Sequence, residues 1–349
     1  MRKIIAKIHL KNIYRNAERF RSLYGNGNRL CAVVKANAYG HGAEEVAFAL
    51  SGIADCFAVA LLDEAIALRV AACGRDILIL TPPLTEWDVL CAAQNGFLLS
   101  VCDLFTARLI LTVGEKYRIP VRVHLKTNTG MNRYGMDLPT LKKVCRLFYG
   151  NKNVRVEGVY SHLYTTDREI SKRQRELFLA HIDEVKGYFP NALCHLSATY
   201  GAMLGSEFAF DMQRVGLGLY GYFPDGIKPT FPLEKGMGLF AQTVQTRKYT
   251  FGGAGYGEAQ KLDGSETLSV VRYGYADGFL RKRENGLNGD ELHINRLCMD
   301  ACIRKERLEK GTWIPIMTDA AYTAAKTGTI AYEVLCAATR RAEFVYDYE

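Results

Sequence analysis

The sequence predicts a (β/α)8 barrel followed by a mainly β C-terminal domain. Over the first two thirds of the chain, eight short apolar runs alternate with amphipathic segments. Apolar runs that alternate with helical patterns indicate parallel βα units, and eight such units indicate a closed barrel. After about residue 229 the pattern changes to Gly-rich turns and short alternating segments, which favour antiparallel strands. A length of 349 residues suits two domains, or one large barrel with an addition.

The eight expected barrel strands are short and almost wholly apolar. They lie near Lys35, Ala58, Ile79, Leu99, Leu125, Val159, His195 and Gly216. Helical patterns separate them, such as residues 62–73, where Ala65 and Leu68 share one face with Leu61. We therefore predict a barrel domain over 1–228 and a β domain over 229–349, with the first few residues as candidates to pair with the β domain.

The expected β domain contains four clear strand patterns and no convincing long amphipathic helix. The strand patterns cover residues 238–251, 267–276, 312–318 and 342–348. Each alternates apolar and polar side chains or is rich in β-branched and aromatic residues, as strands are.

Composition and charge exclude several classes of protein. The net charge is +8, but the densest basic segments, 171–176 and 281–285, also contain acids, and no basic stripe of the nucleic-acid-binding kind is present. The ten cysteines include no C-x-x-C pair, and no apolar run reaches the ~18 residues of a membrane span. The start of the chain lacks the apolar core of a secretory signal. We expect a cytoplasmic protein with reduced thiols and without nucleic-acid or membrane partners.

Polar residues follow five of the expected barrel strands. In a barrel of this kind the active-site groups project from the carboxyl ends of the strands. These groups are Lys35 after the first run, Lys126 and Arg133 after the fifth, His162 after the sixth, Thr199 after the seventh and Arg214 in the eighth. A single one is as easily a solvent-facing strand end as a functional group. Their convergence on one mouth favours function.

Lys35 raises the sharpest question among these residues. It ends the apolar run "CAVVKA", and a buried ammonium is costly unless it is paired, neutralised or covalently used. A lysine that extends into water from the strand end is an equally good interpretation of this stretch alone.

In the eighth unit, the glycines of "RVGLGLYG" would let a phosphate approach the backbone, although glycines near a barrel rim are common.

Other motifs give no second chemistry. "GGAGYGE" (252–258) lacks the G-K-[ST] of a P-loop and the setting of a dinucleotide fingerprint. "CMDAC" (298–302) has no partner half for a metal site, so a pair of structural thiols is the better interpretation. His9, His41, His124 and His181 show no ligand spacing, and we expect no metal site.

The sequence resembles the alanine racemase family, which consists of barrel-type enzymes that depend on pyridoxal phosphate. The resemblance runs over nearly the whole chain and is carried by these motifs: "AKIHLKNIYRN", "VVKANAYGHG", "HLKTNTGMNRYG", "VEGVYSHL", "RVGLGLYG", "GAGYGEA", "YGYADGFLR" and "NRLCMD".

The resemblance implies a cofactor site. Lys35 would bond the cofactor covalently, which removes the cost of a buried ammonium. Arg214 would face the pyridine nitrogen and disfavour its protonation, which favours racemisation over transamination and decarboxylation. The remaining residues implied in cofactor binding are Tyr39, Thr199, Gly216, Leu217, Tyr275 and Arg340.

The resemblance also implies two catalytic bases and a homodimer. Lys35 would act on one face of the substrate α-carbon and Tyr256, from the partner subunit, on the other. His162 would lie close to Arg214 and connect to Tyr256. The substrate carboxylate would be bound by Arg133, with Met299 and Asp300 contributed by the partner chain, so that the active sites are shared. Lys126 matches a lysine that is often carbamylated.

Several positions depart from the family pattern. Ala198-Thr199 replaces Asn-Ser, Asn132 replaces a glycine, and Arg340 aligns with a tyrosine that lines the phosphate. The second domain is shorter around residues 288–300 and between Cys302 and Tyr332. The main prediction is an alanine racemase that supplies D-alanine for cell-wall precursors. The alternatives are a racemase for serine or another small amino acid and a degenerate cofactor-binding paralogue; Arg214 argues against a decarboxylase.

Overall fold

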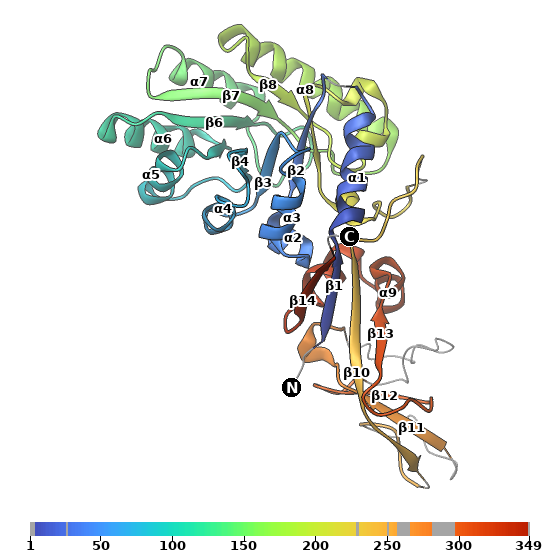
Figure 1. The fold of residues 1–349 in the computed structure, drawn as a ribbon. Coiled ribbons are helices and arrows are strands. Elements are labelled where there is room, and N and C mark those ends of the chain that lie inside the picture. Colours follow the sequence, from blue (N-terminus) through green and yellow to red (C-terminus); the bar gives the residue numbers. More distant parts are fainter. Residues whose placement is uncertain are drawn as a thin grey trace. The chain divides into compact units, whose positions relative to one another are not determined.

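The computed structural model describes residues 4–25, 27–227, 230–249, 251–256, 266–280 and 297–347 (Figure 1). The chain forms two compact units. The barrel unit consists of Ile13–Ala38 and Ala43–Glu234, and the β unit consists of Met1–Asn12, Tyr39–Gly42 and Lys235–Glu349. Residues 39–42 thus group with the β unit, and the proposed limits of 1–228 and 229–349 stay a prediction.

Within its described residues, the barrel unit contains an eight-stranded parallel sheet in the order β8-β7-β6-β5-β4-β3-β2-β9. The strands are β2 (Arg29–Val33), β3 (Cys56–Val59), β4 (Asp76–Ile79), β5 (Leu98–Val101), β6 (Val121–Lys126), β7 (Val154–Tyr160), β8 (Leu193–His195) and β9 (Met212–Val215). Two backbone hydrogen bonds, Asp211 N–H to Cys194 O and Arg214 N–H to Ser197 O, both 2.9 Å, join the β8 and β9 segments and close the sheet. The predicted barrel is confirmed.

Helices follow the strands and lie outside them (Figure 1). They are α1 (Leu10–Ser22), α2 (Lys35–Gly40), α3 (Ala43–Leu50), α4 (Leu62–Leu68), α5 (Glu86–Gln94), α6 (Leu104–Tyr117), α7 (Leu138–Phe148) and α8 (Arg168–Tyr188), with 3-10 turns η1 (Gly201–Met203), η2 (Ser206–Phe208) and η3 (Leu217–Tyr220). Three of them begin where an aspartate, Asp103, Asp137 or Asp167, accepts a hydrogen bond from a backbone N–H three residues on. Such caps satisfy amides that have no partner inside the helix.

The barrel core explains why the eight runs are so apolar. All four residues of β3 are buried, as are all four of β5 and of β9, because each strand is covered both inside and outside the barrel. The exceptions to this apolar pattern are polar side chains that are nevertheless buried, among them Ser100, His124, His195 and Arg214. Buried polar groups need partners, so these exceptions mark the part of the barrel with chemistry to explain.

The β unit contains, within its described residues, a six-stranded sheet in the order β12-β11-β10-β1-β14, with β13 paired to β10. Its elements are β1 (Ile5–His9), β10 (Met237–Tyr249), β11 (Glu266–Val271), β12 (Cys302–Arg304), β13 (Trp313–Met317) and β14 (Glu343–Asp347), with the 3-10 turn η4 (Tyr275–Asp277) and two helices, α9 (Ala320–Thr327) and α10 (Ala331–Ala337). Ile5 pairs with Phe240 of β10 and with Glu343 of β14. The mainly β class is confirmed, and the two short helices were not predicted.

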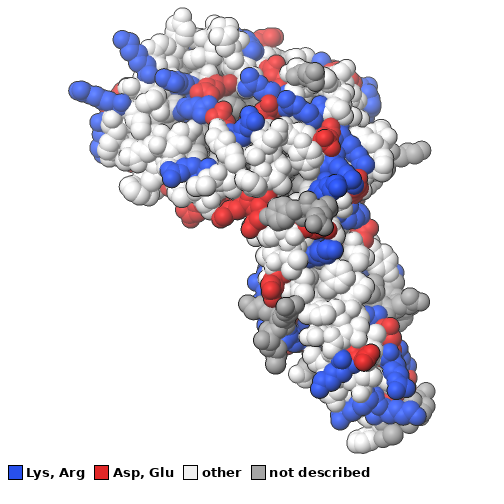
Figure 2. All heavy atoms as spheres, in the orientation of Figure 1, with Lys and Arg blue, Asp and Glu red and all other residues white. Residues whose placement is uncertain are grey.

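The described residues show no helix that is both long and apolar enough to cross a membrane. All ten cysteines lie among them and none is in a disulfide. Basic and acidic side chains are interspersed on the face of the barrel unit drawn in Figure 2, and the basic segment 171–176 lies within α8. The other basic segment, 281–285, and the predicted shortening at residues 288–296 lie outside the described residues.

Candidate active site

Lys35 begins a left-handed turn directly behind the first barrel strand. Ala36, Asn37, Ala38 and Tyr39 have φ values of 51°, 53°, 53° and 53°, and Gly40 has 80°. A left-handed helical conformation costs about 1–2 kcal/mol for each residue that carries a Cβ atom. Runs of such residues persist only where the surroundings determine them, and they cluster at functional sites. The conformation of α2 therefore points to a role for the lysine at its start.

Arg214 of β9 is buried in the barrel and reaches groups on two neighbouring strands. Its Nη1 lies 2.8 Å from His195 Nδ1, and its Nη2 donates to the carbonyl oxygens of Ser161 and Leu196 at 2.7 and 3.1 Å. His162 Nδ1 is 3.3 Å from the same Nη2. Burial lowers the pKa of Arg214. These partners are imidazoles and carbonyls, and among the described residues no carboxylate is hydrogen-bonded to the arginine.

The hydrogen bonds of Arg214 fix the state of two buried histidines. A guanidinium only donates, so His195 Nδ1 accepts and the ring proton lies on Nε2. His195 Nε2 lies 2.9 Å from His124 Nδ1 and therefore donates to it. Burial lowers the pKa of His124 to about 3 and that of His195 well below its ordinary value, with Arg214 adding to both shifts. Both rings are neutral, which avoids placing further positive charge beside the arginine.

Four cations act on His162 at the carboxyl ends of the strands. Burial lowers its pKa, and Arg214, Lys126, Arg133 and Lys35 lower it further in that order. The structure thus brings together the five charged or titratable residues that the strand ends predicted. Positive charge gathered in this way favours anions, such as a phosphate or a carboxylate.

Lys126, the last residue of β6, is a cation whose pKa is strongly lowered. It is buried, its Nζ lies 4.8 Å from the centre of the Tyr160 ring, and it donates to Thr127 O at 3.3 Å. Burial first, and then Arg214, lower its pKa to about 7. A substantial fraction of this lysine is therefore an uncharged, nucleophilic amine near neutral pH.

The residues predicted to let a phosphate approach the backbone lie at the start of η3. Thr199 Oγ1 accepts a hydrogen bond from Gly218 N–H at 3.0 Å, which places its hydroxyl at the first turn that follows Gly216 and Leu217. A Cβ atom on Gly218 would come within 2.5 Å of the Phe20 ring and 3.0 Å of Thr199 Cγ2. The glycine is thus required for close packing.

The loop after β6 shows how one departure from the family pattern is accommodated. Asn132, where the pattern has a glycine, has a φ of 57°. Asparagine tolerates this region better than most residues, and here Asn128 Oδ1 accepts from the N–H groups of Gly130 and Asn132 at 3.0 and 3.1 Å. Arg133 follows and is exposed, with its guanidinium 5.8 Å from the Tyr134 ring.

The other predicted site residues belong to the β unit. Tyr39 is buried, and burial raises the pKa of its phenol. Tyr275 is half-buried, Arg340 is exposed, and Tyr256 and Met299 expose 65% and 54% of their surface. Asp300 accepts a hydrogen bond from Arg341 Nη2 at 2.8 Å, and Arg341 also binds Asp277.

Sequence reasoning missed His195, Tyr160 and His124 as parts of the site. Tyr160 stacks on the His195 ring with centroids 4.8 Å apart, and its hydroxyl lies 2.7 Å from Ser100 Oγ. The available signal was a polar residue inside an otherwise apolar run. That signal does not say which face of the strand the side chain occupies.

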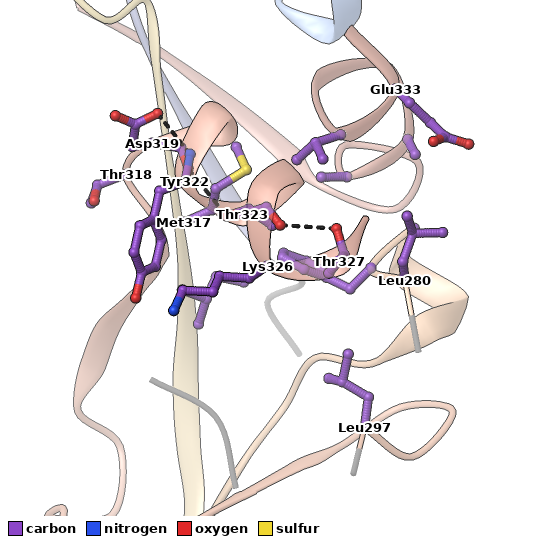
Figure 3. Close-up of a pocket in the computed structure, with 16 residues that line it drawn as sticks. Leu280, Leu297, Met317, Thr318, Asp319, Tyr322, Thr323, Lys326, Thr327 and Glu333 are labelled. Carbon is purple, nitrogen blue, oxygen red and sulfur yellow. Dashed lines mark hydrogen bonds between the residues drawn. The ribbon is translucent and has the colours of Figure 1, made fainter. Parts of the chain in front are cut away.

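The β unit also holds a mainly apolar cavity of about 340 Å³. It lies among α9, α10, the end of β13 and the segment after η4 (Figure 3). Lys326 and Tyr322 both line it, and Lys326 Nζ lies 5.5 Å from the centre of the Tyr322 ring. None of the predicted site residues lines it.

The fold and the strand-end cluster define a class: a barrel enzyme with a β unit, whose site is built around a lysine and a buried arginine and accepts anions. Comparison with known proteins narrows the class. Residues 8–224 match the family model described as alanine racemase, N-terminal domain, and residues 237–346 match alanine racemase, C-terminal domain. The chain belongs to the alanine racemase family, as the motifs predicted.

Relatives match over nearly their whole length. The alanine racemase of Geobacillus kaustophilus is 34% identical over 354 residues, 95% of this chain and 91% of its own. The solved alanine racemase of Clostridium difficile 630 has a TM-score of 0.90 at 28% identity, covering 98% of this chain and 95% of its own. That of Bartonella henselae, solved with covalently bound pyridoxal phosphate, has a TM-score of 0.88 at 26% identity and covers 99% and 100%.

Proposed function

We propose that the protein is a pyridoxal-phosphate-dependent racemase that interconverts L- and D-alanine. Membership of the family over both units supports this activity. The observation that carries it is the buried Arg214, whose partners are neutral imidazoles and carbonyls. A cation opposite the pyridine nitrogen weakens the electron sink, which suits brief proton removal and return. A decarboxylase of similar plan would carry an acid there.

The residues present fit the cofactor. Arg133, one of the cations that act on His162, suits the carboxylate of a substrate, and the Thr199–Gly218 turn offers a close backbone approach for the cofactor phosphate. When bound, pyridoxal phosphate supplies the electron sink that acidifies the α-proton of an amino acid. Lys35, Thr199, Arg214, Gly216 and Leu217 would hold it in the barrel unit. Tyr39, Tyr275 and Arg340 of the β unit are further proposed ligands.

Two bases would move the proton. Lys35 Nζ would remove or return it on one face of the α-carbon, and the hydroxyl of Tyr256, contributed by the partner subunit, would serve the other face. His162 would connect Arg214 with that tyrosine. Arg133 would bind the substrate carboxylate beside Met299 and Asp300 contributed in trans. Two complete sites then require a homodimer.

Lys126 is proposed to carry a carbamate. Its pKa of about 7 leaves much of the Nζ amine uncharged at neutral pH. An uncharged amine can attack carbon dioxide, forming an N–C bond and releasing a proton. The single negative charge of the product would offset part of the positive charge of its neighbours Arg133 and Arg214.

The direct test is racemisation by the purified protein with added pyridoxal phosphate. L-Alanine and L-serine are supplied separately while the D-enantiomer and the absorption of lysine-bound cofactor are followed. Rapid formation of D-alanine supports the proposal. Faster turnover of serine would favour the second candidate, a serine racemase, which is suggested by Arg340 at the position of the family's tyrosine. Cofactor absorption without turnover of either would indicate a degenerate paralogue.

Substitution of Tyr256 tests the two-base mechanism. Tyr256→Phe removes the hydroxyl that would serve one face of the substrate, so we expect racemisation to fall by 100-fold or more, on the order of a general base contribution. The matched control is Tyr149→Phe, since Tyr149 is a surface tyrosine of the same 65% exposure. Full activity in Tyr256→Phe would refute the assignment.

A cytoplasmic location and a supply of D-alanine to cell-wall precursors follow as proposals from the same family assignment.

A further inference from the structure

One carboxylate of the barrel unit connects two backbone segments that follow neighbouring strands. Glu64 Oε1 accepts a hydrogen bond from Ala36 N–H at 2.7 Å. Its Oε2 accepts from Ala60 N–H at 2.7 Å and Leu61 N–H at 3.1 Å. The first amide follows β2 and the other two follow β3, and these strands are paired in parallel. Glu64 therefore caps α4, its own helix, with one oxygen and the turn behind Lys35 with the other.

The Ala36 N–H group is the part of this turn that bears most directly on the orientation of Lys35. It belongs to the peptide group that joins Lys35 to Ala36, so holding it restricts ψ of Lys35 and hence the direction of the lysine side chain. It is also the first amide within the left-handed turn, where no carbonyl of the same turn can accept from it. The carboxylate supplies a charged acceptor at this place, and such hydrogen bonds are the stronger kind.

Two other hydrogen bonds of the turn lie further along the chain. Ala38 N–H donates to Val34 O at 2.8 Å, and Asn37 Oδ1 accepts from Ala43 N–H at 2.8 Å. Neither bond touches the peptide that follows Lys35. The aspartate caps of α6, α7 and α8 accept from the helix that they precede. The additional bond from Glu64 to a segment outside its own helix has no counterpart among those three caps.

We infer that Glu64 is a positioning residue for Lys35: it holds the left-handed turn so that the lysine amine stands ready to bond the cofactor. The inference rests on the proposed function, in which Lys35 is the cofactor lysine. In this role the carboxylate acts through the backbone groups to which it is hydrogen-bonded.

The test compares Glu64→Gln with the wild-type protein. The carboxamide keeps the size of the side chain but offers one oxygen, so an N–H of the amide must face either Ala36 or the pair Ala60 and Leu61. We expect hydrogen exchange of the Ala36 amide in the cofactor-free protein to quicken about tenfold, the effect of losing one hydrogen bond to a charged acceptor. We also expect the apparent Kd for pyridoxal phosphate to rise by a similar factor and its bonding to Lys35 to slow.

Two further variants separate positioning from capping. Asp63→Asn removes a charge from the adjacent exposed residue of α4 and should leave exchange at Ala36 and cofactor affinity unchanged. Glu64→Asp keeps the charge, which can still cap α4, but is one methylene too short to bridge both segments; it should reproduce the loss at Ala36 even if Glu64→Gln fails to fold.

The outcomes are distinguishable. If Glu64→Gln and Glu64→Asp quicken exchange at Ala60 and Leu61 alone, with cofactor affinity equal to that of Asp63→Asn, Glu64 is only a cap of α4 and the inference is wrong. If the wild-type protein does not bond the cofactor, the proposed function fails first and takes the role of Lys35 with it. Exchange at Ala36 in the cofactor-free protein would then still report whether Glu64 holds the turn.

Discussion

At the scale of single residues, the site is a set of cations with few balancing charges. Arg214 is held by imidazoles and carbonyls, and the histidines beside it are neutral because burial and the arginine lower their pKa values. A buried cation without a carboxylate is unfavourable until an anion arrives. The cost of burying this positive charge therefore favours the binding of an anion beside it.

The buried Lys126 should make stability depend on pH. Its pKa is about 7 in the folded protein and 10.5 unperturbed, so between these values the unfolded chain binds the proton and the folded chain does not. The free energy of unfolding should therefore rise by up to about 1.4 kcal/mol per pH unit from pH 7 to 10 through this group, and the full penalty of the buried charge remains below pH 7. Lys126→Met should remove this slope and stabilise the protein most at low pH.

Urea titrations in carbonate-free buffer at pH 6, 8 and 9.5 measure this difference. Carbonate is left out because a carbamate would change the charge of the group. Lys152→Met, at an exposed lysine, controls for the loss of a positive charge. Equal pH slopes for the wild-type protein and Lys126→Met would contradict the prediction.

Which site residues could be foreseen depends on where they lie on a strand. Lys35, Lys126 and His162 come at or just after strand ends, and the rule that barrel sites lie there located them without the structure. His195 and His124 lie inside strands, and their partnership depends on which face of the barrel each side chain occupies. Glu64 lay in a helical pattern, where an exposed first-turn acid is ordinary and its second partner is 28 positions away.

At the scale of elements, the sequence pattern located strands better than turns. The barrel strands are buried on both faces, so their near-continuous apolar runs stood out. The helices α9 and α10 span 8 and 7 residues and are rich in alanine, too short for a clear period. In the left-handed turn, Ala36, Ala38 and Tyr39 have positive φ values although none is a glycine, the residue that normally signals this conformation, so Asn37 and Gly40 alone did not reveal its extent.

The end of α6 offers a stabilising substitution. Its C-cap residue Arg118 has a φ of 51° and a ψ of 40°, and its N–H donates to Gly114 O. Glycine avoids the steric penalty of this conformation, so Arg118→Gly should raise the free energy of unfolding by about 1 kcal/mol after the added entropy of the unfolded chain. Arg118→Ala removes the same charge but keeps the Cβ atom, and urea titration should show no comparable gain. Equal stabilities for the two variants would contradict the explanation.

At the scale of the whole molecule, the prediction of two parts with different architecture was correct in kind. The eight βα units and the change to β structure were visible in the sequence, and both family models match. The grouping of residues 39–42 with the β unit was not visible. It depends on long-range contacts such as that of Gly40, where a Cβ atom would lie 2.3 Å from Leu335 O.

A shared site can be tested by complementation. Subunits with Lys35→Ala and subunits with Tyr256→Phe are co-expressed with different tags, and the mixed dimer is isolated. If each site combines Lys35 of one subunit with Tyr256 of the other, one of two sites is intact and about half of wild-type activity returns. Homodimers of each variant serve as inactive controls. A mixed dimer as inactive as these would place both bases in one subunit.

The strand β1 has a consequence for how the protein is made. It pairs with β10 and with β14, and His9 lies 3.3 Å from Asp347, which is 338 positions further along the chain. At 5–20 residues per second, a ribosome needs on the order of half a minute to supply both neighbours. During that time the first strand emerges with bare edges, while the eight βα units can already assemble. Translation therefore imposes an order in which the barrel precedes the β unit, and the nascent strand is the segment that a chaperone would need to shield.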